Sequence, residues 1–395
     1  MQDLQADVRY ALNGGPFGSK LVSRMYVDNG VPVIRGANLP MDRRFNCDDF
    51  VYVTEEKADE LHANLARPGD VVFTQRGTLG QVGLIPADAP FPRFVISQSQ
   101  MKLTVDEAVA DAAFVYYVFR TTDTIQRIVA HESSSGVPHI NLDTLRNFEI
   151  TLPPLDVQRR IAAVLSAYDD LIENNTRRIA ILEEMARRLY EEWFVHFRFP
   201  GHETTPILDT PQGLLPEGWS DGCLGEFVTL AYGKALKASA RIEGPYPVYG
   251  SSGVVGTHHE YLVTGPGIVV GRKGNVGSVF WSIEPFYPID TVFYVQTQLP
   301  LAYVFYNLRG QRFLNNDAAV PGLNRNQAYS LRFLVPPPDL LRRFAAIVAP
   351  QFRMSRSLDQ QNANLRAQRD LLLPKLVSGD IDVSAAEEAL PVAAE

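Results

Sequence analysis

The sequence has few cysteines, no long apolar run and no excess of positive charge. Only Cys47 and Cys223 occur among 395 residues, and they lie far apart. This argues against a disulfide scaffold or a cysteine-based zinc site, and it favours a reducing, cytoplasmic location. No stretch of about 18 apolar residues is present, and the polar first ten residues do not resemble a secretory signal. We therefore expect neither a membrane span nor export.

The net charge of −8 by itself argues against a chain that binds nucleic acid. The charge is unevenly spread, however, because five acidic residues and no basic residue follow Lys375. The remainder is closer to neutral and can carry local basic loops. If the chain binds DNA, we expect partner subunits to supply much of the charge that neutralises phosphates.

The motifs of several enzyme classes are also missing. No Gly-x-x-x-x-Gly-Lys-Ser/Thr loop occurs, so an ATP-driven motor is not expected in this chain. The proline pairs follow Leu152 and Val335 rather than Asn or Asp, so they do not form an Asn/Asp-Pro-Pro-Phe/Tyr amino-methyltransferase motif. His258 and His259 lack a third ligand at a plausible spacing, and we predict no metal site. The sequence therefore predicts no catalytic residue.

The most informative feature is an internal repeat. Residues 153–163 match residues 336–346 without a gap, at an offset of 183, including the prolines, one Asp, a pair of Arg and a pair of Ala. Weaker matches precede them: residues 68–72 resemble 266–270, and each is followed by a basic residue, a glycine and a second glycine three positions on. The chain is therefore a tandem duplication of a globular segment followed by a helix.

The globular segments are typical of a mixed α/β (α+β) fold. Short apolar runs at 70–74, 268–270 and 292–296 are bounded by Gly and Pro and predict strands. Aromatic-rich stretches at 112–121 and 301–309 predict one helix in each segment, packed on the sheet.

Two long helices are predicted after the proline pairs, from 156 to about 198 and from 339 to about 373. The first contains no Pro or Gly, and at roughly 60 Å it is too long for one domain to bury. Two unrelated surface helices would be the simpler alternative, but the shared Pro-Pro-x-Asp entry favours an antiparallel coiled coil between them. The predicted seam contains Ile161, Leu165, Tyr168, Ile172, Asn175, Ile179, Leu182, Leu189 and Trp193 in the first helix, and Phe344, Val348, Leu358, Leu365 and Leu372 in the second.

Three segments resemble conserved regions of the specificity subunits of type I restriction–modification systems. Residues 152–162 resemble a signature of that family, while 188–197 and 373–380 resemble the ends of its two conserved helices. Residues 216–219, Pro-Glu-Gly-Trp, resemble the start of a family domain, whereas the first segment begins near Leu4 and lacks that Trp. The resemblance covers nearly the whole chain in the right order.

The resemblance implies a non-catalytic DNA-binding subunit. Two target-recognition domains would each read one half of a bipartite site in double-stranded DNA, and the helices would set the gap. It also implies two methyltransferase subunits and translocase–nuclease subunits as partners; S-adenosylmethionine, ATP and Mg²⁺ would bind to those partners rather than to this chain. The corresponding boundaries are 1–151 and 201–335 for the domains, 152–200 and 336–380 for the spacer helices, and 381–395 for an acidic, disordered tail.

We expect DNA contacts in glycine-rich loops that carry Arg, Lys, Asn or Gln, because such loops suit both base edges and phosphates. For a single loop, an ordinary tight turn explains the same residues. Arg76 and Lys273 are favoured because they recur in both copies. The predicted contacts are Ser19, Lys20, Arg35, Asn38, Gln75, Arg76, Thr78, Gln98, Gln100, Ser134 and His139 in the first segment, and Lys234, Lys237, Tyr249, Ser251, Arg272, Lys273, Asn275, Asn316, Asn324 and Arg325 in the second.

Two other functions stay open at this point. One is a coiled-coil adaptor that holds two protein-binding domains and never contacts DNA. The other is an enzyme, such as a hydrolase, whose site follows no recognised motif. Co-purification with a methyltransferase and footprinting on a two-part DNA site would separate these from a specificity subunit.

Overall fold

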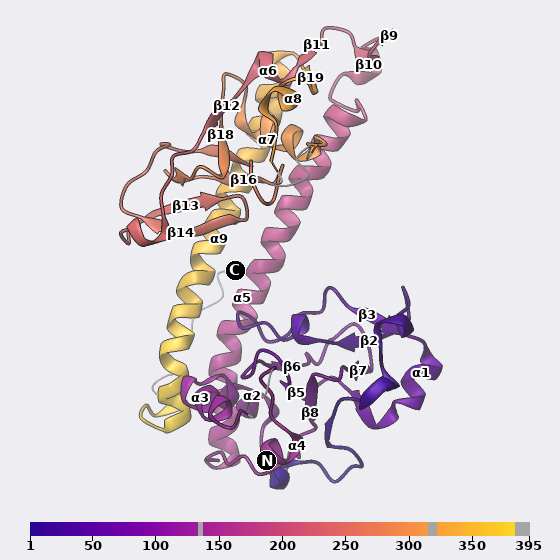
Figure 1. The fold of residues 1–395 in the computed structure, drawn as a ribbon, viewed down its shortest axis with the longest axis vertical. Helices are drawn as coiled ribbons and strands as arrows, with labels where there is room; N and C mark the ends of the chain where they lie inside the picture. Colours follow the sequence, from indigo (N-terminus) through magenta and orange to yellow (C-terminus); the bar gives the residue numbers. More distant parts are fainter. Residues whose placement is uncertain (133–136, 315–321, 384–395) are drawn as a thin grey trace. The chain divides into compact units, whose positions relative to one another are not determined.

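The computed structural model describes residues 1–132, 137–314 and 322–383. Its contacts divide the chain into two compact units (Figure 1). Unit 1 comprises Met1–Asn175 and Gln361–Glu395, and unit 2 comprises Thr176–Gln360. Each unit thus combines one globular segment with part of both long helices. The five boundaries given above stay a prediction.

The two long helices are α5 (Leu155–Tyr190), which continues into a wide π turn η6 (Glu191–Val195), and α9 (Pro338–Ser378). In unit 1, Asp169 pairs with Arg369 and Asn175 with Asn362, so the helices run in opposite directions. The predicted antiparallel pairing of two long helices is therefore confirmed. Over the described residues, no helix is both long and apolar enough to cross a membrane.

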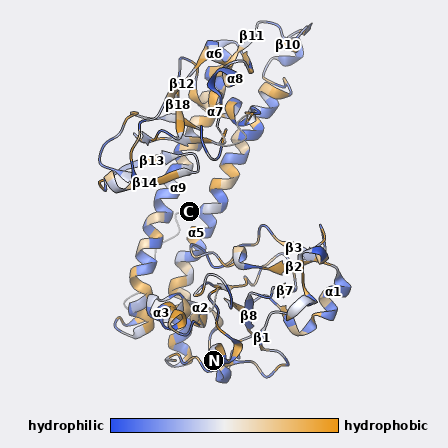
Figure 2. Ribbon diagram, in the orientation of Figure 1, coloured by the Kyte–Doolittle hydropathy of each residue, from blue (hydrophilic) through white to orange (hydrophobic). Residues whose placement is uncertain are grey.

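Alternating apolar and polar stripes follow both helices (Figure 2), as a two-sided helix pair requires. Most of the predicted seam is buried: Ile161, Leu165, Tyr168, Ile172, Asn175, Trp193, Phe344, Val348 and Leu358. The remaining seam residues are only half-buried: Ile179, Leu182, Leu189, Leu365 and Leu372.

Unit 1 contains two four-stranded sheets, in the orders β1-β8-β5-β6 and β3-β2-β7-β4. The strands are β1 (Leu12–Gly14), β2 (Val31–Ile34), β3 (Val51–Val53), β4 (Leu65–Ala66), β5 (Val71–Thr74), β6 (Val82–Leu84), β7 (Phe94–Ile96) and β8 (Gln100–Leu103). The helices are η1 (Gln2–Leu4), η2 (Gly18–Lys20), η3 (Ser23–Met25), η4 (Gly36–Asn38), α1 (Glu55–Glu60), η5 (His62–Asn64), α2 (Ala112–Arg120), α3 (Thr122–Ala130) and α4 (Leu142–Arg146). Only β2 and β7 pair in parallel among the described ladders of this unit.

Unit 2 repeats this plan, with sheets β12-β18-β15-β16 and β14-β13-β17 and the two-stranded pairs β11-β19 and β10-β9. The strands are β9 (Ile207–Thr210), β10 (Gly213–Pro216), β11 (Ser220–Cys223), β12 (Val228–Tyr232), β13 (Tyr246–Gly250), β14 (Gly253–His258), β15 (Gly267–Gly271), β16 (Val279–Ser282), β17 (Tyr287–Pro288), β18 (Val292–Thr297) and β19 (Arg332–Val335). The helices are η7 (His202–Thr204), α6 (Leu224–Phe227), η8 (Ala238–Ala240), α7 (Leu301–Gly310) and α8 (Arg325–Tyr329).

The strands β5 and β15 are each buried on both faces, which explains their continuous apolar sequences. In β5, Val71 and Phe73 face a core that includes α2 and α5, while Val72 faces the core of the second sheet. In β15, Ile268 and Val270 face the core against α7, and Val269 faces the smaller sheet. The predicted strands at 70–74, 268–270 and 292–296 and the predicted helices at 112–121 and 301–309 are thus all present. In unit 1, α2 lies beside the β1-β8-β5-β6 sheet (Figure 1), and its Tyr117 bonds to Asp169 of α5.

Candidate nucleic-acid interface

A short loop with two glycines follows β5 in unit 1, at residues 75–80. The backbone N–H groups of Gln75 and Arg76 donate to the carbonyl of Ser99, over 2.7 and 3.2 Å. The N–H of Ile140 donates to the carbonyl of Gln75 over 3.0 Å, which ties the loop to the segment before α4. These bonds hold the backbone and leave the side chain of Arg76 exposed.

The loop that follows β15 in unit 2, at residues 272–277, has the same hydrogen bonds. Arg272 and Lys273 donate from their backbone N–H groups to the carbonyl of Thr291, over 2.9 and 3.1 Å. The N–H of Leu323 donates to the carbonyl of Arg272 over 2.8 Å. We call residues 75–80 and 272–277 the glycine loops. Their matching bonds make Gln75 equivalent to Arg272, and Arg76 equivalent to Lys273.

Glycine is required twice in each glycine loop. Gly77 and Gly80 have φ values of 103° and 87°, and Gly274 and Gly277 have values of 78° and 77°. Side chains other than glycine rarely adopt this left-handed region. The repeated Gly-x-x-Gly spacing therefore marks one loop conformation built twice.

The exposed cation of each glycine loop is also held by an isolated β-bridge. Arg76 bridges His139, and Lys273 bridges Gly322. The two partners, His139 and Gly322, differ by the same 183 residues as the sequence repeat. Thr78 is exposed in the first loop, and Asn275 is exposed in the second, where its amide donates to the hydroxyl of Ser252 over 3.0 Å. The side chains that the sequence singled out in these loops thus reach the surface together.

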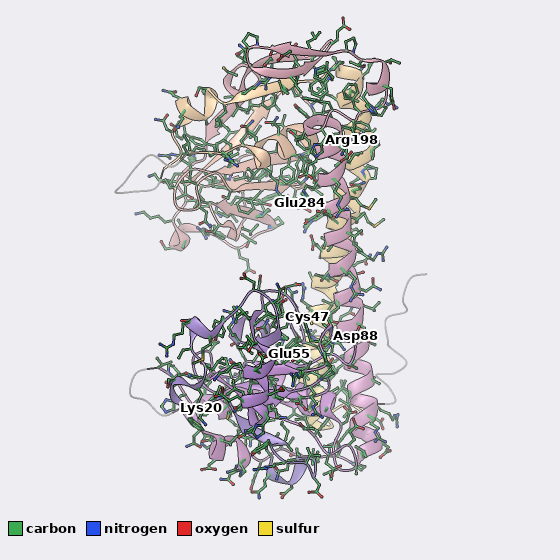
Figure 3. All side chains as sticks on the ribbon, turned by 90° about the vertical axis from the view of Figure 1, so that its right-hand side faces the viewer. Lys20, Cys47, Glu55, Asp88, Arg198 and Glu284 are labelled. Carbon is green, nitrogen blue, oxygen red and sulfur yellow. The ribbon has the colours of Figure 1, made fainter. Side chains whose placement is uncertain are left out.

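Other predicted contacts of unit 1 lie on η2. Ser19 and Lys20 are exposed, and Figure 3 places Lys20 on the side of unit 1 away from α5. The amide of Gln98 donates to the carbonyls of Gly18 and, over 3.0 Å, Leu21. Gln98 therefore supports the segment that presents Ser19 and Lys20.

Three predicted contacts of unit 1 have a structural role instead. The carboxamide of Asn38 is buried, accepts from the N–H of Arg35 and donates to the carbonyls of Asn46 and Asp48. The buried Gln100 accepts from the hydroxyl of Ser97. Arg35 is half-buried and donates to the backbone at Asp49 over 2.8 Å. We therefore correct the prediction for Asn38 and Gln100, because their side chains cannot reach DNA in this conformation.

The predicted contacts of unit 2 divide in the same way. Lys234 and Lys237 are exposed after β12, and the hydroxyl of Ser251 lies against Gly274, where an added Cβ would be 3.1 Å away. Tyr249 is buried against Phe286 with ring centroids 5.5 Å apart, so its prediction as a DNA contact is also corrected. Ser134 and Asn316 lie outside the described residues.

Asn324 and Arg325 begin α8 beside the second glycine loop. The Oδ1 atom of Asn324 accepts from two backbone N–H groups and caps the helix. Asn324 could therefore accept a hydrogen bond from a base through Oδ1 only if this cap were broken. The Arg325 guanidinium lies 4.9 Å from the ring centroid of Tyr232, and the Arg272 guanidinium lies 5.0 Å from the same centroid. Two cations therefore share one aromatic ring at this edge.

The histidine pair lies beside a third possible metal ligand, Glu260, which the sequence analysis did not consider. The ligand atoms of His258, His259 and Glu260 lie within 4.8 Å of one another. The N–H of Ile242 donates to Nδ1 of the buried His258 over 3.1 Å, so this nitrogen already accepts a hydrogen bond within the protein.

Ion pairs that the sequence analysis did not predict fix each globular segment to a helix. In unit 1, Arg44 donates to both carboxylate oxygens of Glu173 on α5, over 2.9 and 2.7 Å. Burial lowers the pKa of the Arg44 guanidinium, but Glu173 and Asp170 more than offset this and raise it. In unit 2, Arg356 on α9 pairs with Glu284, which Figure 3 labels.

Glu173 and Arg356 are equivalent positions, since they differ by 183 residues. The signal was thus present in the repeat, but nothing in the sequence pointed to Arg44 or Glu284 as partners. The charges are reversed: the helix is acidic in unit 1 and basic in unit 2. The first globular segment therefore contacts its helix through a positive charge, and the second contacts its helix through a negative charge.

A buried polar cluster joins the two helices to α2 in unit 1. Asp169 and Arg369 form an ion pair in which both side chains are almost fully buried, and the hydroxyl of Tyr117 donates to Asp169 over 2.6 Å. Burial, and then the charge of Asp169, raise the pKa of the Tyr117 phenol well above its usual value. The phenol thus stays a donor to Asp169.

A family model for the type I restriction modification DNA specificity domain matches residues 24–184 and 216–339. These segments cover well over half of the chain and include both glycine loops. The chain belongs to this family.

Several specificity subunits are similar to this chain. The MjaIX specificity subunit of Methanocaldococcus jannaschii is 24% identical over 371 residues, covering 84% of this chain and 82% of the relative. A putative specificity subunit of Mycoplasma pneumoniae is 32% identical over 180 residues, or 44% of each chain. The crystal structure of the type I S subunit from M. genitalium has a TM-score of 0.57 at 19% identity, covering 93% of this chain and 94% of that one.

As a specificity subunit, the chain supplies DNA sequence recognition to a type I restriction–modification system. The family is non-catalytic and binds no cofactor of its own, within a complex that is an enzyme. Family membership sets aside both the adaptor without DNA contact and the unrecognised hydrolase.

Proposed function

We propose that unit 1 and unit 2 each read one half of a bipartite site in double-stranded DNA, with the glycine loops at the contact surface. The observation that carries this proposal is that one loop conformation is built twice with different side chains. A backbone that is the same in both units, with side chains that differ, suits two domains that recognise different base sequences. Arg76 and Lys273, the cations present in both loops, suit phosphate contacts, which fix position without reading sequence.

We propose that α5 and α9 set the gap between the half-sites and dock two methyltransferase subunits. In the complete complex, translocase–nuclease subunits would join them, and S-adenosylmethionine, ATP and Mg²⁺ would act on these partners in the cytoplasm. Within unit 2, Ile181 and Met185 on α5 and Ile347 and Met354 on α9 are large exposed apolar side chains. Exposed apolar residues that gather on a surface are common at protein–protein interfaces.

The modular reading is tested by domain exchange. Residues 1–151 are replaced by the equivalent domain of a relative with another specificity, and the full chain is expressed with its partner subunits. Sequencing of methylated host DNA should show one half-site changed and the other half-site and the gap unchanged. A strain with the native chain serves as the control. A change in both half-sites would contradict independent reading by the two units.

A further inference from the structure

The strand that precedes the shared ring has an equivalent in unit 1. Gly233, which follows Tyr232, donates from its N–H to the carbonyl of Val292 over 3.2 Å. Gly15, which follows Gly14, donates to the carbonyl of Gln100 over 2.8 Å. In each unit, this bond joins the end of the first strand of the four-stranded sheet to the strand that pairs with it. These strands are β1 and β8 in unit 1, and β12 and β18 in unit 2.

Both glycines are also packed against a backbone carbonyl. A Cβ added at Gly15 or at Gly233 would lie only 1.9 or 2.1 Å from a carbonyl oxygen, so both positions require glycine. Gly14 in unit 1 is therefore equivalent to Tyr232 in unit 2.

In unit 2, the guanidinium groups of Arg272 and Arg325 both lie over the ring of Tyr232. Tyr232 is 51% exposed, and both guanidinium groups lie within the range of a cation–π contact with it. Arg272 is further fixed by a bond from Nη1 to the carbonyl of Asp290, over 2.8 Å. Among the described residues, neither Arg272 nor Arg325 forms an ion pair with a carboxylate. Two unneutralised guanidinium groups held together favour a ligand that is rich in acceptors.

In unit 1 the equivalent positions carry neither a charge nor an aromatic ring. A Cβ added at Gly14 would lie 3.5 Å from Oε1 of Gln75, an ordinary contact distance, so the Gln75 amide lies directly beside Gly14. Leu142 occupies the position equivalent to Arg325, at the repeat offset of 183. Gln75 thus lies over Gly14 where Arg272 lies over Tyr232.

One position of the glycine loops therefore carries a positive charge in both units, and the position before it differs in charge between the units. Arg76 and Lys273 keep the positive charge, as a phosphate contact requires in any sequence. Gln75 and Arg272 differ in both charge and hydrogen-bonding pattern. Residues that read the bases of two different half-sites must differ, whereas residues that only bind the backbone need not.

We propose that Arg272 reads a guanine in one half-site, that Gln75 reads an adenine at the corresponding place in the other, and that Tyr232 positions Arg272. This rests on the proposed function of the two units. Arg pairs in a bidentate manner with O6 and N7 of guanine, and Gln with N6 and N7 of adenine. With Nη1 bound to Asp290, the Nη2 and Nε groups of Arg272 form the edge that fits guanine.

The experiment uses the full chain in complex with its partner subunits. Binding is measured by competition between duplexes in which each base of the target is replaced in turn. Arg272→Ala should lower discrimination at one guanine position of the second half-site by roughly five- to 150-fold and leave the other positions unchanged. Arg272→Gln should shift the preference at that position toward adenine. Gln75→Ala should relax one adenine position of the first half-site.

The controls separate base reading from folding and from general electrostatics. Lys273→Ala, next to Arg272, should weaken binding to all duplexes alike. Arg309→Ala removes a guanidinium that lies 5.5 Å from the ring of Phe305 in the same unit, and it should change no preference. Tyr232→Phe should keep the discrimination of Arg272, whereas Tyr232→Leu should reduce it at the same position. Thermal melting of each variant checks that the fold is kept.

Two results would overturn the inference while the proposed function stands. One is a uniform loss of binding in Arg272→Ala, which indicates a phosphate contact. The other is unchanged base discrimination in Arg272→Ala while the complex still recognises the bipartite target. A native complex that reads no bipartite target would overturn both.

Discussion

Asn175 of α5 donates a hydrogen bond from Nδ2 to Oδ1 of Asn362 of α9 over 3.0 Å, and both side chains are buried. The positions equivalent to them by the repeat are Leu358 and Ile179, which are apolar. The helix pair thus has a polar layer in unit 1 where it has an apolar layer in unit 2. A buried polar pair of this kind fixes register at a cost in stability.

Removing one partner of the Asn pair should cost more than removing both. We expect Asn175→Leu to lower the free energy of unfolding by about 1–3 kcal/mol, because the buried Asn362 amide loses a partner. Asn175→Leu combined with Asn362→Leu should regain most of that loss. Thermal or urea unfolding of the full chain measures both. If the double variant lost the sum of the two single losses, the coupling between the amides would be absent.

The buried ion pair should be sensitive to the loss of its carboxylate. Asp169→Ala leaves the Arg369 guanidinium buried with only Asp370 as a described ion partner, and we expect a loss of about 3–5 kcal/mol. Arg342→Ala is the matched control, because Arg342 forms an exposed pair with Asp339 on the same helix and should change stability by less than about 1 kcal/mol. Equal losses in the two variants would argue against a special role of burial.

The ion pair between Arg44 and Glu173 should tolerate reversal of both charges better than reversal of one. Arg44→Glu places three carboxylates together at Glu173 and Asp170 and should destabilise the chain. Adding Glu173→Arg should recover part of the loss, with a coupling of roughly 0.5–3 kcal/mol in a double-mutant cycle of unfolding free energies. High salt should reduce the coupling. A coupling of zero at low salt would show that the contact does not stabilise unit 1.

Arg76 and Lys273 should behave as phosphate contacts. We expect Arg76→Ala or Lys273→Ala to weaken binding of the complex to specific and non-specific duplexes alike, and to lower the slope of log affinity against log salt by about one. Titrations at several salt concentrations measure this. Thr78→Ala, an exposed neutral position of the first glycine loop, should leave the slope unchanged. A slope that did not move in the cation variants would remove these side chains from the backbone contacts.

Lengthening both helices should lengthen the unread gap. One heptad is inserted after Glu183 in α5 and one before Met354 in α9, so that the seam continues in phase. Seven residues add about 10 Å, or about three base pairs of B-DNA. Sequencing of methylated DNA gives the new gap. Inserting two residues at each place is the contrasting variant, because a rotation of about half a turn should break the seam and prevent assembly. An active heptad variant with the original gap would exclude the helices as a ruler.

Much of the fold could be predicted because the pattern of apolar residues and the repeat both report on local structure. The strands at Val71–Thr74 and Gly267–Gly271 and the two long helices appear as apolar periodicity with clear ends. The equivalence of Arg76 and Lys273 followed from the repeat, and the backbone bonds of both glycine loops agree with it.

The direction of each polar side chain could not be predicted. Asn38 has the residue type of a base contact, but its amide bonds to backbone carbonyls eight and ten positions away, which depends on how the loop closes. Tyr249 likewise fills an aromatic core that only the folded sheet creates. The contact between Arg44 and Glu173 spans 129 residues, a separation at which neither spacing nor composition identifies a partner.

Because the charges at Glu173 and Arg356 are reversed, a globular segment that fits the first position in the chain does not fit the second position equally well. A foreign first segment that keeps a cation at the position of Arg44 can replace the native one and dock on α5 at once. The same segment copied into the second place would bring its arginine against Arg356, and the chain would start with repulsion where it now has an ion pair. Exchanging first segments for first segments, and second for second, would therefore keep each ion pair, whereas moving a segment from one place to the other would replace it with two like charges.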